Sequence, residues 1–288
     1  MWWNFPEHFD PIFFSLGPVS VSWYGICFLL GAIVSLIFFR IFLNRFGRER
    51  LEIHISHDEF FTLSLRVFLG ALVGARVGYA ILYDASFFLA HPLSLISPFD
   101  RETGLWIGIA GMSVHGGILG GILAAFLFSR KYGKSFLSVL DALSCAAPVA
   151  IFFGRIGNFL AGELFGRTTD VSWGMVFPLS GDTALRHPSA LYEAFGEGVI
   201  LFCIVFFLAR RRRTPGMLFA WTLGLYGSIR FFIEFFREPD RHIGFLFGFF
   251  SMGQALSVLT VTSALFLVGW IRLRKNDILS PHKGCCRT

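Results

Sequence analysis

The sequence predicts an all-α membrane protein that crosses the bilayer about seven times. Hydrophobic residues make up 55% of the 288 residues, charged residues only 15%, and the mean hydropathy is +0.64. Soluble proteins average about 25% charged residues. The apolar residues are also grouped in stretches of roughly the length that a helix needs to cross a bilayer. A multi-spanning membrane protein therefore explains the composition better than a soluble fold.

Seven apolar stretches can be drawn, separated by Gly, Pro and charged residues. Each is near the roughly 20 residues of a transmembrane helix, and the fourth is the shortest. The loops between them are too short for a soluble domain of useful size, so we expect one integral membrane domain over residues 1–288. The stretches are residues 19–39, 60–83, 107–129, 136–153, 188–209, 215–235 and 249–271.

The basic residues set the orientation that we expect. The net charge is +6, but Lys and Arg lie between the apolar stretches, which favours a topological role over nucleic-acid binding. Sixteen of them follow the first, third, fifth and seventh stretches, and six lie in the alternate segments. Because the positive-inside rule places the first set in the cytoplasm, we expect the N-terminus outside, the C-terminus inside, and a basic cytoplasmic tail over residues 272–288.

A polar segment, GRIGNFLAGELFGR at residues 154–167, falls on the outer side, where that rule disfavours arginine. Arg155 can bind a phosphate bidentately, Asn158 can donate and accept hydrogen bonds, and Glu163 can orient an arginine. The four glycines argue against a continuous ideal helix. The segment is thus either a phosphate-binding site or a structural loop.

The sixth stretch contains YGSIRFFIEFF, in which Tyr226, Arg230 and Glu234 are four residues apart. A helix places them on one face. Charges at membrane depth cost about 2.5–3.5 kcal/mol on insertion scales and usually mark function. The alternative is a self-contained Arg230–Glu234 pair that holds helices together.

Two glycine-rich segments carry further polar groups. In GMSVHGGILGG, residues 111–121, His115 stands among glycines whose spacing lets helices approach closely. His115 is a candidate base, because histidine titrates near neutral pH, or a hydrogen-bonded packing residue. In LGALVGARVGY, residues 69–79, helix packing explains the glycines but not Arg76.

Arginines from separate segments, one histidine, tyrosines and carboxylates together suit an anionic lipid headgroup. A water-soluble anion would need an aqueous path, which a sequence does not reveal. The residues therefore favour a site that binds an anionic lipid headgroup, with an anion transporter as the alternative.

Several motifs, in order along nearly the whole chain, resemble the bacterial phosphatidylglycerol–prolipoprotein diacylglyceryl transferase family. Residues 154–166 match the family pattern G-R-x-G-N-F-x-N-x-E-x-x-G except at Ala161, where the family usually has Asn. Ala190 replaces a usual Gln in RHPSALYE. The other matches are SWYG at 22–25, GARVGY at 74–79, GMSVHGG at 111–117 and YGSIRFFIEFFREPD at 226–240.

This resemblance implies transfer of a diacylglyceryl group from phosphatidylglycerol to the lipobox cysteine thiol in the signal peptide of a prolipoprotein. A thioether forms and glycerol-1-phosphate leaves, without a metal or cofactor. The family's enzymes are seven-span proteins of the bacterial inner membrane with the N-terminus outside, in agreement with the distribution of basic residues. Another phospholipid headgroup transferase or phosphatase would share the arginines but lack these ordered motifs.

The resemblance also implies roles for individual residues. Arg155 binds phosphatidylglycerol, Arg230 is an essential headgroup arginine, and His115 is the candidate base for the thiol. Six further residues match family positions and are expected to shape the pocket: Tyr24, Asn158, Glu163, Gly166, Tyr226 and Glu234.

Overall fold

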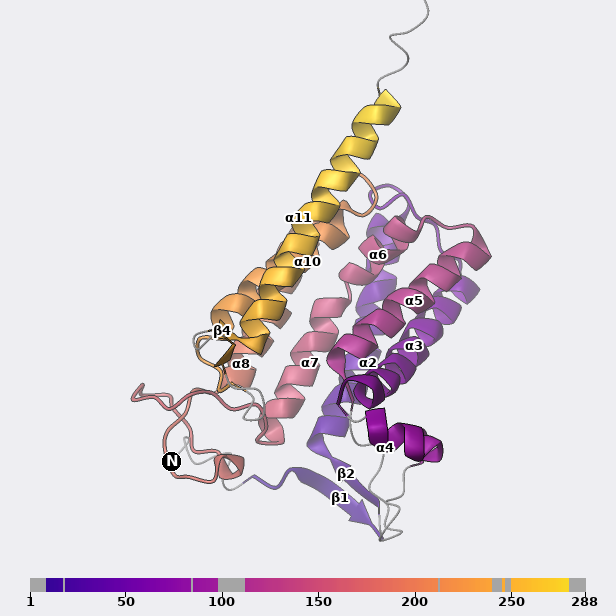
Figure 1. Ribbon diagram of the computed structural model, residues 1–288. Coiled ribbons are helices and arrows are strands. Elements are labelled where there is room, and N and C mark those ends of the chain that lie inside the picture. The colour runs from indigo at the N-terminus through magenta and orange to yellow at the C-terminus, as the bar shows by residue number, and fades with distance from the viewer. Residues whose placement is uncertain are drawn as a thin grey trace, which may run out of the picture. The chain divides into compact units, whose positions relative to one another are not determined.

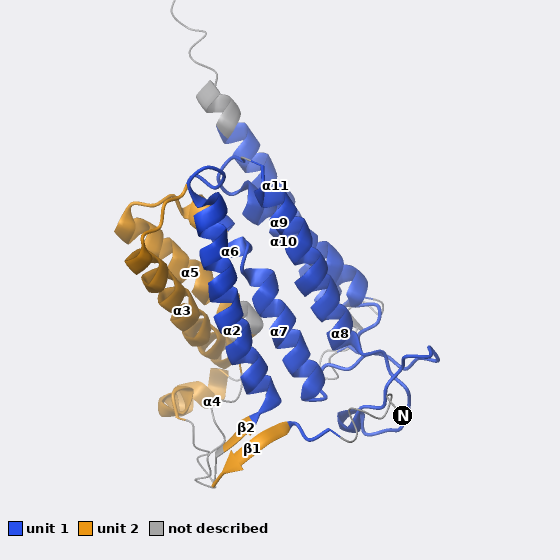
Figure 2. Ribbon diagram, turned by 180° about the vertical axis from the view of Figure 1, so that it is seen from behind, with its two compact units in different colours: residues 1–11, 22–52, 141–288 blue, residues 12–21, 53–140 orange. Residues whose placement is uncertain are grey.

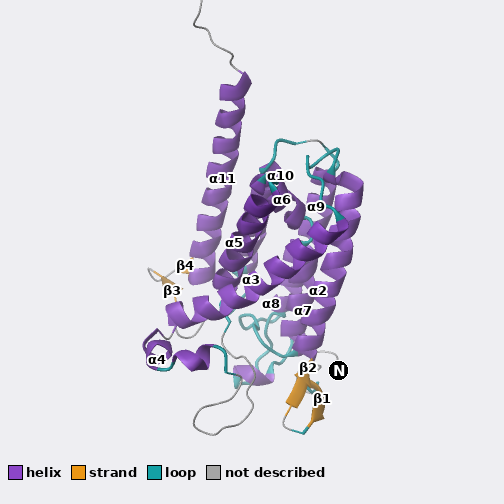
Figure 3. Cartoon of the chain, turned by 90° about the vertical axis from the view of Figure 1, so that its right-hand side faces the viewer, coloured by secondary structure: helices purple, strands orange, loops and turns teal. Residues whose placement is uncertain are grey.

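A computed structural model describes most of the chain, and helices account for the majority of the described residues (Figure 3). This confirms the helical membrane architecture that the sequence predicts. The structure describes residues 9–17, 19–83, 85–97, 112–211, 213–239, 245–246 and 250–279.

Two short sheets correct the all-α prediction. β1 (Ile12–Leu16) pairs with β2 (Val19–Ser22), and β3 (Phe245–Leu246) pairs antiparallel with β4 (Phe250–Ser251). β1 is rich in aromatic and β-branched residues, which favour strands. Gly17, which follows it, has a φ of +60°. Glycine adopts this conformation without strain, and it lets the chain turn within a few residues.

The chain forms two compact units, which Figure 2 shows in different colours. Unit 1 consists of Met1–Pro11, Ser22–Glu52 and Asp141–Thr288, and unit 2 of Ile12–Val21 and Ile53–Leu140. One integral membrane domain over the whole chain remains a prediction.

Unit 2 is built on a close pair of helices, α3 (His57–Tyr83) and α5 (Val114–Tyr132). A Cβ added at Gly74 would meet the carbonyl oxygen of Gly116 and would lie 2.8 Å from the Cα of Gly120. Larger residues would push the helices apart, so the predicted small-residue packing is confirmed. The unit also contains α4 (Ala85–Ala90) and the 3-10 helix η3 (Pro92–Leu95).

Arg76 of α3, which glycine packing did not explain, contacts the end of η3. Its Nε donates to the carbonyl of Leu95 at 2.9 Å and its Nη2 to the carbonyl of Ser94 at 2.7 Å. The guanidinium also lies over the ring of Phe88, 5.1 Å from the centroid. Arg76 therefore ties η3 to α3.

Unit 1 holds the remaining helices except α6 (Phe136–Ser144), which is divided between the two units (Figure 1). α2 packs along α7, and α10 lies side by side with α11. The segment from residue 189 to 209 is one continuous helical stretch whose middle part, η5, is π-helical. The elements are α2 (Trp23–Phe42), η2 (Leu43–Gly47), α7 (Ala147–Leu160), η4 (Pro178–Ser180), α8 (Ser189–Glu193), η5 (Ala194–Ile200), α9 (Leu201–Ala209), α10 (Met217–Ile233) and α11 (Met252–Leu279).

The buried Asp141 fixes the start of α10. It lies in α6 (Phe136–Ser144) and accepts hydrogen bonds from the main-chain amides of Gly216 and Phe219, each at 2.7 Å. The first amides of a helix have no partner within the helix, and a negative charge is favoured beside them. Asp141 therefore caps the helix that carries Arg230.

In the part of the chain that the structure describes, four helices are long and apolar enough to cross a bilayer, namely Trp23–Gly47, His57–Ile81, Ser189–Ala209 and Met252–Arg274. A fifth span is possible if α6 and α7, which meet at a bend of 44°, are counted together, and α10 is a shorter apolar helix. The third predicted stretch begins outside the described residues, which resume at residue 112. The exact number of seven spans therefore stays a prediction.

Large apolar side chains are exposed along these helices, among them Leu29, Leu65, Leu123 and Leu265, each more than half exposed. Soluble monomers rarely expose apolar patches of more than a few hundred Å². The exposed side chains are consistent with helices that face lipid. Of the predicted basic tail, residues 272–279 continue α11, and residues 280–288 lie outside the described part of the chain.

Candidate functional site

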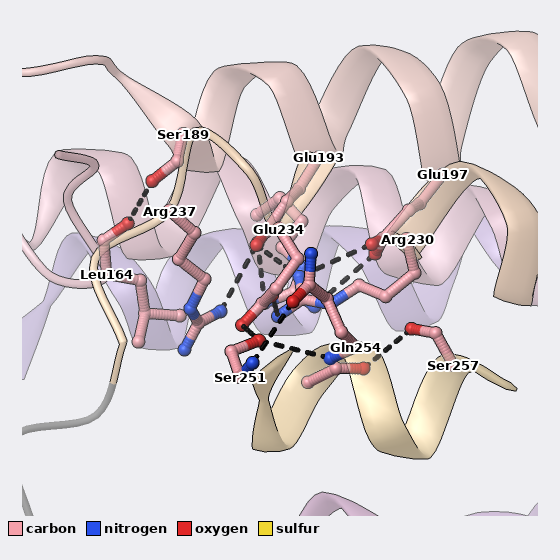
Figure 4. Close-up of polar contacts among 12 residues, drawn as sticks. Leu164, Ser189, Glu193, Glu197, Arg230, Glu234, Arg237, Ser251, Gln254 and Ser257 are labelled. Carbon is pink, nitrogen blue, oxygen red and sulfur yellow. Dashed lines mark hydrogen bonds and ion pairs between the residues drawn. The ribbon is translucent and has the colours of Figure 1, made fainter. Parts of the chain in front are cut away.

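Six charged side chains meet inside unit 1. They come from three helical segments and from the residues that follow α10. The arginines are Arg155 of α7, Arg230 of α10 and Arg237, and the glutamates are Glu193 of α8, Glu197 of η5 and Glu234 at the end of α10. Figure 4 labels Arg230, Arg237 and the three glutamates.

Glu193 lies at the centre of this charged cluster, and its side chain is fully buried. Its Oε2 is 2.9 Å from Nη1 of Arg155. Its Oε1 accepts a hydrogen bond from Nη1 of Arg230 and another, at 3.1 Å, from Nη1 of Arg237. A buried carboxylate is costly unless it is paired and hydrogen-bonded, and three guanidinium groups meet that need.

Glu197 bridges two of the same arginines. Its Oε2 is 3.3 Å from Nη2 of Arg155, and its Oε1 is 3.4 Å from Nη1 of Arg230. Glu193 and Glu197 lie four residues apart in a continuous helical stretch, where two like charges repel each other. The arginines offset this repulsion.

Glu234 forms an ion pair with the second terminal nitrogen of Arg230, Nη2. Its Oε2 is 3.0 Å from Nη2 of Arg230, and its Oε1 accepts a hydrogen bond from the hydroxyl of Ser251 at 2.9 Å (Figure 4). Ser251 also caps α11, because its hydroxyl accepts from the amide of Gln254 at 3.1 Å. The start of α11 is thus coupled to the charged cluster.

Tyr24, Asn158 and Glu163 lie near the Arg155 end of the cluster. Tyr24 interacts electrostatically with both Arg155 and Glu163, and Asn158 donates a long hydrogen bond, 3.5 Å, to Glu163. A Cβ on Gly157 would approach the ring of Tyr24 to 3.1 Å, so this glycine lets α2 and α7 pack closely. These groups could contact the polar part of a headgroup held by Arg155.

Tyr226 and Arg230 share one face of α10 with Glu234, as their spacing predicts. Tyr226 interacts electrostatically with Arg230, Arg155 and Glu197. The predicted Arg230–Glu234 pair is present, but it is not self-contained, because Arg230 also contacts both glutamates of the α8–η5 stretch. Arg230 is therefore part of a network across several helices.

Gly166 holds the loop after α7 against the residues that follow α10. Its amide donates to the carbonyl of His187 at 2.8 Å, and it forms an isolated antiparallel bridge with Arg237. A Cβ here would collide with the carbonyl of Phe236 and lie 2.6 Å from His187. Only glycine fits this close approach, which sets the backbone of Arg237.

Two titratable groups of the same loop have shifted pKa values. Hydrogen bonds from Arg186 and Ser180 hold the pKa of Asp182 at about 2. Burial lowers the pKa of His187, whose Nδ1 is 3.0 Å from the hydroxyl of Tyr192. His187 is therefore neutral at pH 7, and Asp182 is ionised.

Metal ligands are not grouped in the part of the chain that the structure describes: no three His, Cys, Asp or Glu side chains there are placed to hold an ion. The charged cluster offers instead three guanidinium groups that are largely buried. Arginine recognises phosphate oxygens with two parallel N–H donors, so the arrangement suits a phosphate or another oxyanion.

A family model described as prolipoprotein diacylglyceryl transferase matches residues 11–270. The chain belongs to this family. Relatives named phosphatidylglycerol–prolipoprotein diacylglyceryl transferase are similar over nearly their whole length. One from Geobacter sulfurreducens is 42% identical over 92% of this chain and 94% of its own. One from a Wolbachia of Drosophila simulans is 40% identical, over 93% and 97%, and one from Pseudoalteromonas atlantica is 42% identical, over 96% and 94%.

Within this member of the family, the structure brings together Arg155, Arg230, Tyr226 and Glu234, and places Tyr24, Asn158 and Glu163 near Arg155. Gly166 contributes to the site through its backbone, which forms a bridge with Arg237. His115 is the second residue of α5 in unit 2, and its side chain lies outside the description. Its place relative to the arginines therefore stays a prediction.

The expected break in the GRIGNFLAGELFGR segment is wrong for its first half. α7 continues through Gly154 and Gly157 and ends at Leu160. The intrinsic cost of a glycine in a helix, about 1 kcal/mol, is small compared with what packing can supply. The chain leaves the helix only at Gly162, whose φ is +70°. Arg155 and Asn158 thus project from a helix, and Glu163 from the loop.

Sequence reasoning missed Glu193, Glu197 and Arg237 of this transferase as site residues. Glu193 and Glu197 lie four residues apart within an apolar stretch, which is the same signal that identified Arg230 and Glu234. Arg237 lies just beyond the sixth apolar stretch, and no local sequence pattern indicates that it contacts Glu193.

Proposed function

We propose that this chain transfers the diacylglyceryl group of phosphatidylglycerol to a cysteine thiol of prolipoproteins, the first step of lipoprotein maturation. The family match over residues 11–270 carries this conclusion. The charged cluster supports it, because three arginines between apolar helices suit a lipid with an anionic headgroup.

The reaction is a substitution at the glyceryl carbon that bears the phosphate. The sulfur of the lipobox cysteine forms a bond to this carbon, and the carbon–oxygen bond to the phosphate breaks. The electron pair of that bond leaves with the oxygen as glycerol-1-phosphate, and the thiol proton passes to a base. Negative charge develops on the phosphate, where fixed guanidinium groups stabilise it best.

Arg155 and Arg230 are the proposed phosphate ligands. Both contact Glu193 and Glu197, so their guanidinium groups lie beside each other although they come from different helices. Glu193 and Glu234 position them, and Arg237 adds a third cation. Such preorganisation lets the site stabilise the leaving group without rearranging during the reaction.

The nucleophile is a thiol whose unperturbed pKa is about 8.5, so it must lose a proton near neutral pH. We propose His115 as the acceptor, because histidine is the side chain suited to this task at that pH. Nearby arginines favour the thiolate as well. The substrate supplies the reacting cysteine, so none is needed from this chain.

Six residues complete the proposed lipid pocket. Tyr24, Asn158 and Glu163 would contact the headgroup beside Arg155, and Tyr226 would do so beside Arg230. Glu234 orients Arg230, and Gly166 sets the backbone near Arg237.

The proposed setting is the bacterial inner membrane, crossed seven times by one integral domain. The N-terminus would lie outside, and the basic tail at 272–288 in the cytoplasm. The bias of Lys and Arg supports this orientation. The substrate lipid and the signal peptides of prolipoproteins are both membrane components, so the site would receive them from the bilayer.

A single assay tests the activity. Purified full-length protein in detergent is given phosphatidylglycerol and a synthetic lipobox peptide, and the products are identified by mass. We expect a peptide thioether together with glycerol-1-phosphate. Transfer to another acceptor would indicate a different headgroup transferase. Anion flux in vesicles without a covalent product would indicate a transporter, and either outcome would refute the proposal.

A further inference from the structure

Glu197 differs from the other two glutamates of the charged cluster in how it binds its arginines. Glu193 is 2.9 Å from Arg155 and 3.1 Å from Arg237, and Glu234 is 3.0 Å from Arg230. The two contacts of Glu197 are longer, at 3.3 and 3.4 Å. The Glu197 carboxylate therefore makes the longest contacts of the three, although each of its oxygens accepts a hydrogen bond from an arginine.

The carboxylate of Glu197 also contacts the two arginines in the way that a bound oxyanion would. One carboxylate oxygen faces Arg155 and the other faces Arg230, so the group joins two guanidinium ions from two helices. A phosphodiester presents two unesterified oxygens in much the same way, and arginine binds both kinds of group through the same donors. A phosphate in this position would contact both proposed ligands at once.

The N–H groups of Arg155 are not fully used by Glu193. Although Oε2 of Glu193 is 2.9 Å from Nη1 of Arg155, this buried oxygen accepts no directed hydrogen bond from any described residue. The same holds for Oε2 of Glu234 beside Arg230. These two oxygens are therefore held by the charge of the arginines rather than by a directed hydrogen bond.

The net charge of the cluster determines whether a proton must be taken up when an oxyanion binds. Three guanidinium ions and three carboxylates sum to zero when all are ionised. A phosphodiester adds one negative charge in apolar surroundings, where an uncompensated charge is costly. Uptake of one proton by a carboxylate restores neutrality. Glu197, whose contacts with its arginines are the longest of the three, is the carboxylate to which we assign this proton.

We propose that the lipid phosphate binds in the position of the Glu197 carboxylate on Arg155 and Arg230, and that Glu197 takes up a proton as it yields these contacts. This inference rests on the proposed function. The charged and titratable groups that face Glu197 are Arg155 of α7, Arg230 and Tyr226 of α10, and Glu193 of the preceding turn. Glu197 also lies in η5, and π-helical turns are frequent at functional sites.

The test measures phosphatidylglycerol binding to the purified full-length protein in detergent, without peptide, from about pH 6 to 8. If binding requires a proton on Glu197, the apparent Kd of the unmodified protein rises by up to about tenfold per pH unit. In Glu197→Gln the side chain is neutral at every pH. Its Kd should be nearly independent of pH and, at pH 8, at least about tenfold lower than that of the unmodified protein.

Glu59→Gln is the matched control, since Glu59 is a carboxylate of unit 2 that pairs with Lys134 at 3.0 Å. It should keep the steep pH dependence of the unmodified protein. If Glu197→Gln fails to fold, calorimetry of the unmodified protein in buffers of different ionisation enthalpy gives the same answer, because up to one proton should be taken up per lipid bound.

A flat pH dependence in the unmodified protein, or equal slopes in it and Glu197→Gln, would overturn the inference, as would the absence of proton uptake in calorimetry. The transfer assay separates this failure from that of the proposed function. A protein that forms the thioether but binds lipid without proton uptake refutes only the role of Glu197. A protein that forms no thioether refutes the proposed function.

Discussion

Arg155 and Glu193 form an ion pair between α7 and α8, with Nη1 and Oε2 2.9 Å apart and the carboxylate fully buried. The same carboxylate accepts a hydrogen bond from Arg230 through its other oxygen. One glutamate therefore sets the separation of the two arginines that we assign to the phosphate. Its position explains how guanidinium groups from distant parts of the sequence act on one ligand.

The first prediction concerns these two arginines. Arg230→Ala should abolish transfer and Arg155→Ala should severely weaken lipid binding, because removing one donor from a charge-stabilising site typically costs about 100- to 1,000-fold in rate. Turnover and lipid binding of the folded variants check this. Arg210→Ala is the control, since Arg210 stacks on Phe206 rather than joining the charged cluster. Near-normal turnover of folded Arg230→Ala would contradict the headgroup assignment.

The second prediction compares two glycines of the GRIGNFLAGELFGR segment. A Cβ at Gly166 would collide with Phe236 and His187, whereas a Cβ at Gly154 would meet nothing within 4 Å. Gly166→Ala should lower the melting temperature and the activity, because the loop must move away from Arg237. Gly154→Ala should leave stability unchanged or raise it by up to about 1 kcal/mol, as alanine favours a helix. Equal melting temperatures would refute the proposed role of Gly166.

The third prediction concerns Asp141, which caps α10 through Gly216 and Phe219. Asp141→Ala leaves these amides without their acceptor and should cost about 1–3 kcal/mol of stability. Because α10 carries Arg230, activity should fall as well. Thermal unfolding in detergent measures the effect. An unchanged melting temperature would show that the cap contributes nothing.

Much of the charged cluster and of the helix packing could be predicted from residue spacing within single segments. Tyr226, Arg230 and Glu234 share a face because a helix repeats every 3.6 residues, and the glycines of α3 and α5 meet because small residues permit close packing. The contacts of Arg237 with Glu193 and of Ser251 with Glu234 join segments far apart in the chain. Spacing along one segment carries no information about such partners.

The helix through Gly154 and Gly157 was not predictable for a different reason. Glycine disfavours helices by only about 1 kcal/mol, so tertiary packing readily overrides that preference. α7 packs against α2, where a side chain at Gly157 would press on Tyr24 and Cys27. Gly157 therefore allows α7 to pack closely against α2, and it does not break the helix.

The fourth prediction concerns topology. Residues 210–213 and the C-terminal tail should be cytoplasmic and residues 154–187 on the outer side, because Lys and Arg are concentrated in the first set of segments. Single cysteines in a cysteine-free background, labelled in intact cells with an impermeant reagent, test this. Labelling at position 288 from outside would refute the orientation, and labelling at Thr183 from outside is expected.

The last prediction concerns His115, whose two possible roles differ in their dependence on pH. As the base, it would bind the thiol proton, and the rate would rise with pH through its pKa. His115→Asn keeps a similar size and hydrogen-bonding capacity but cannot act as a base near neutral pH. We expect a loss of about 100-fold or more, the usual range for general base catalysis.

Activity of His115→Asn should be partly restored at alkaline pH, because the thiol ionises by itself near its pKa of about 8.5. A packing residue would show no such recovery, since its loss affects all pH values alike. The measurement is turnover of the purified variant across the pH range, with the melting temperature as a check on folding. Turnover within a few-fold of the unmodified protein at neutral pH would exclude an essential base. Water would then have to take the proton, or the arginines would have to lower the pKa of the thiol enough for it to ionise without a dedicated base.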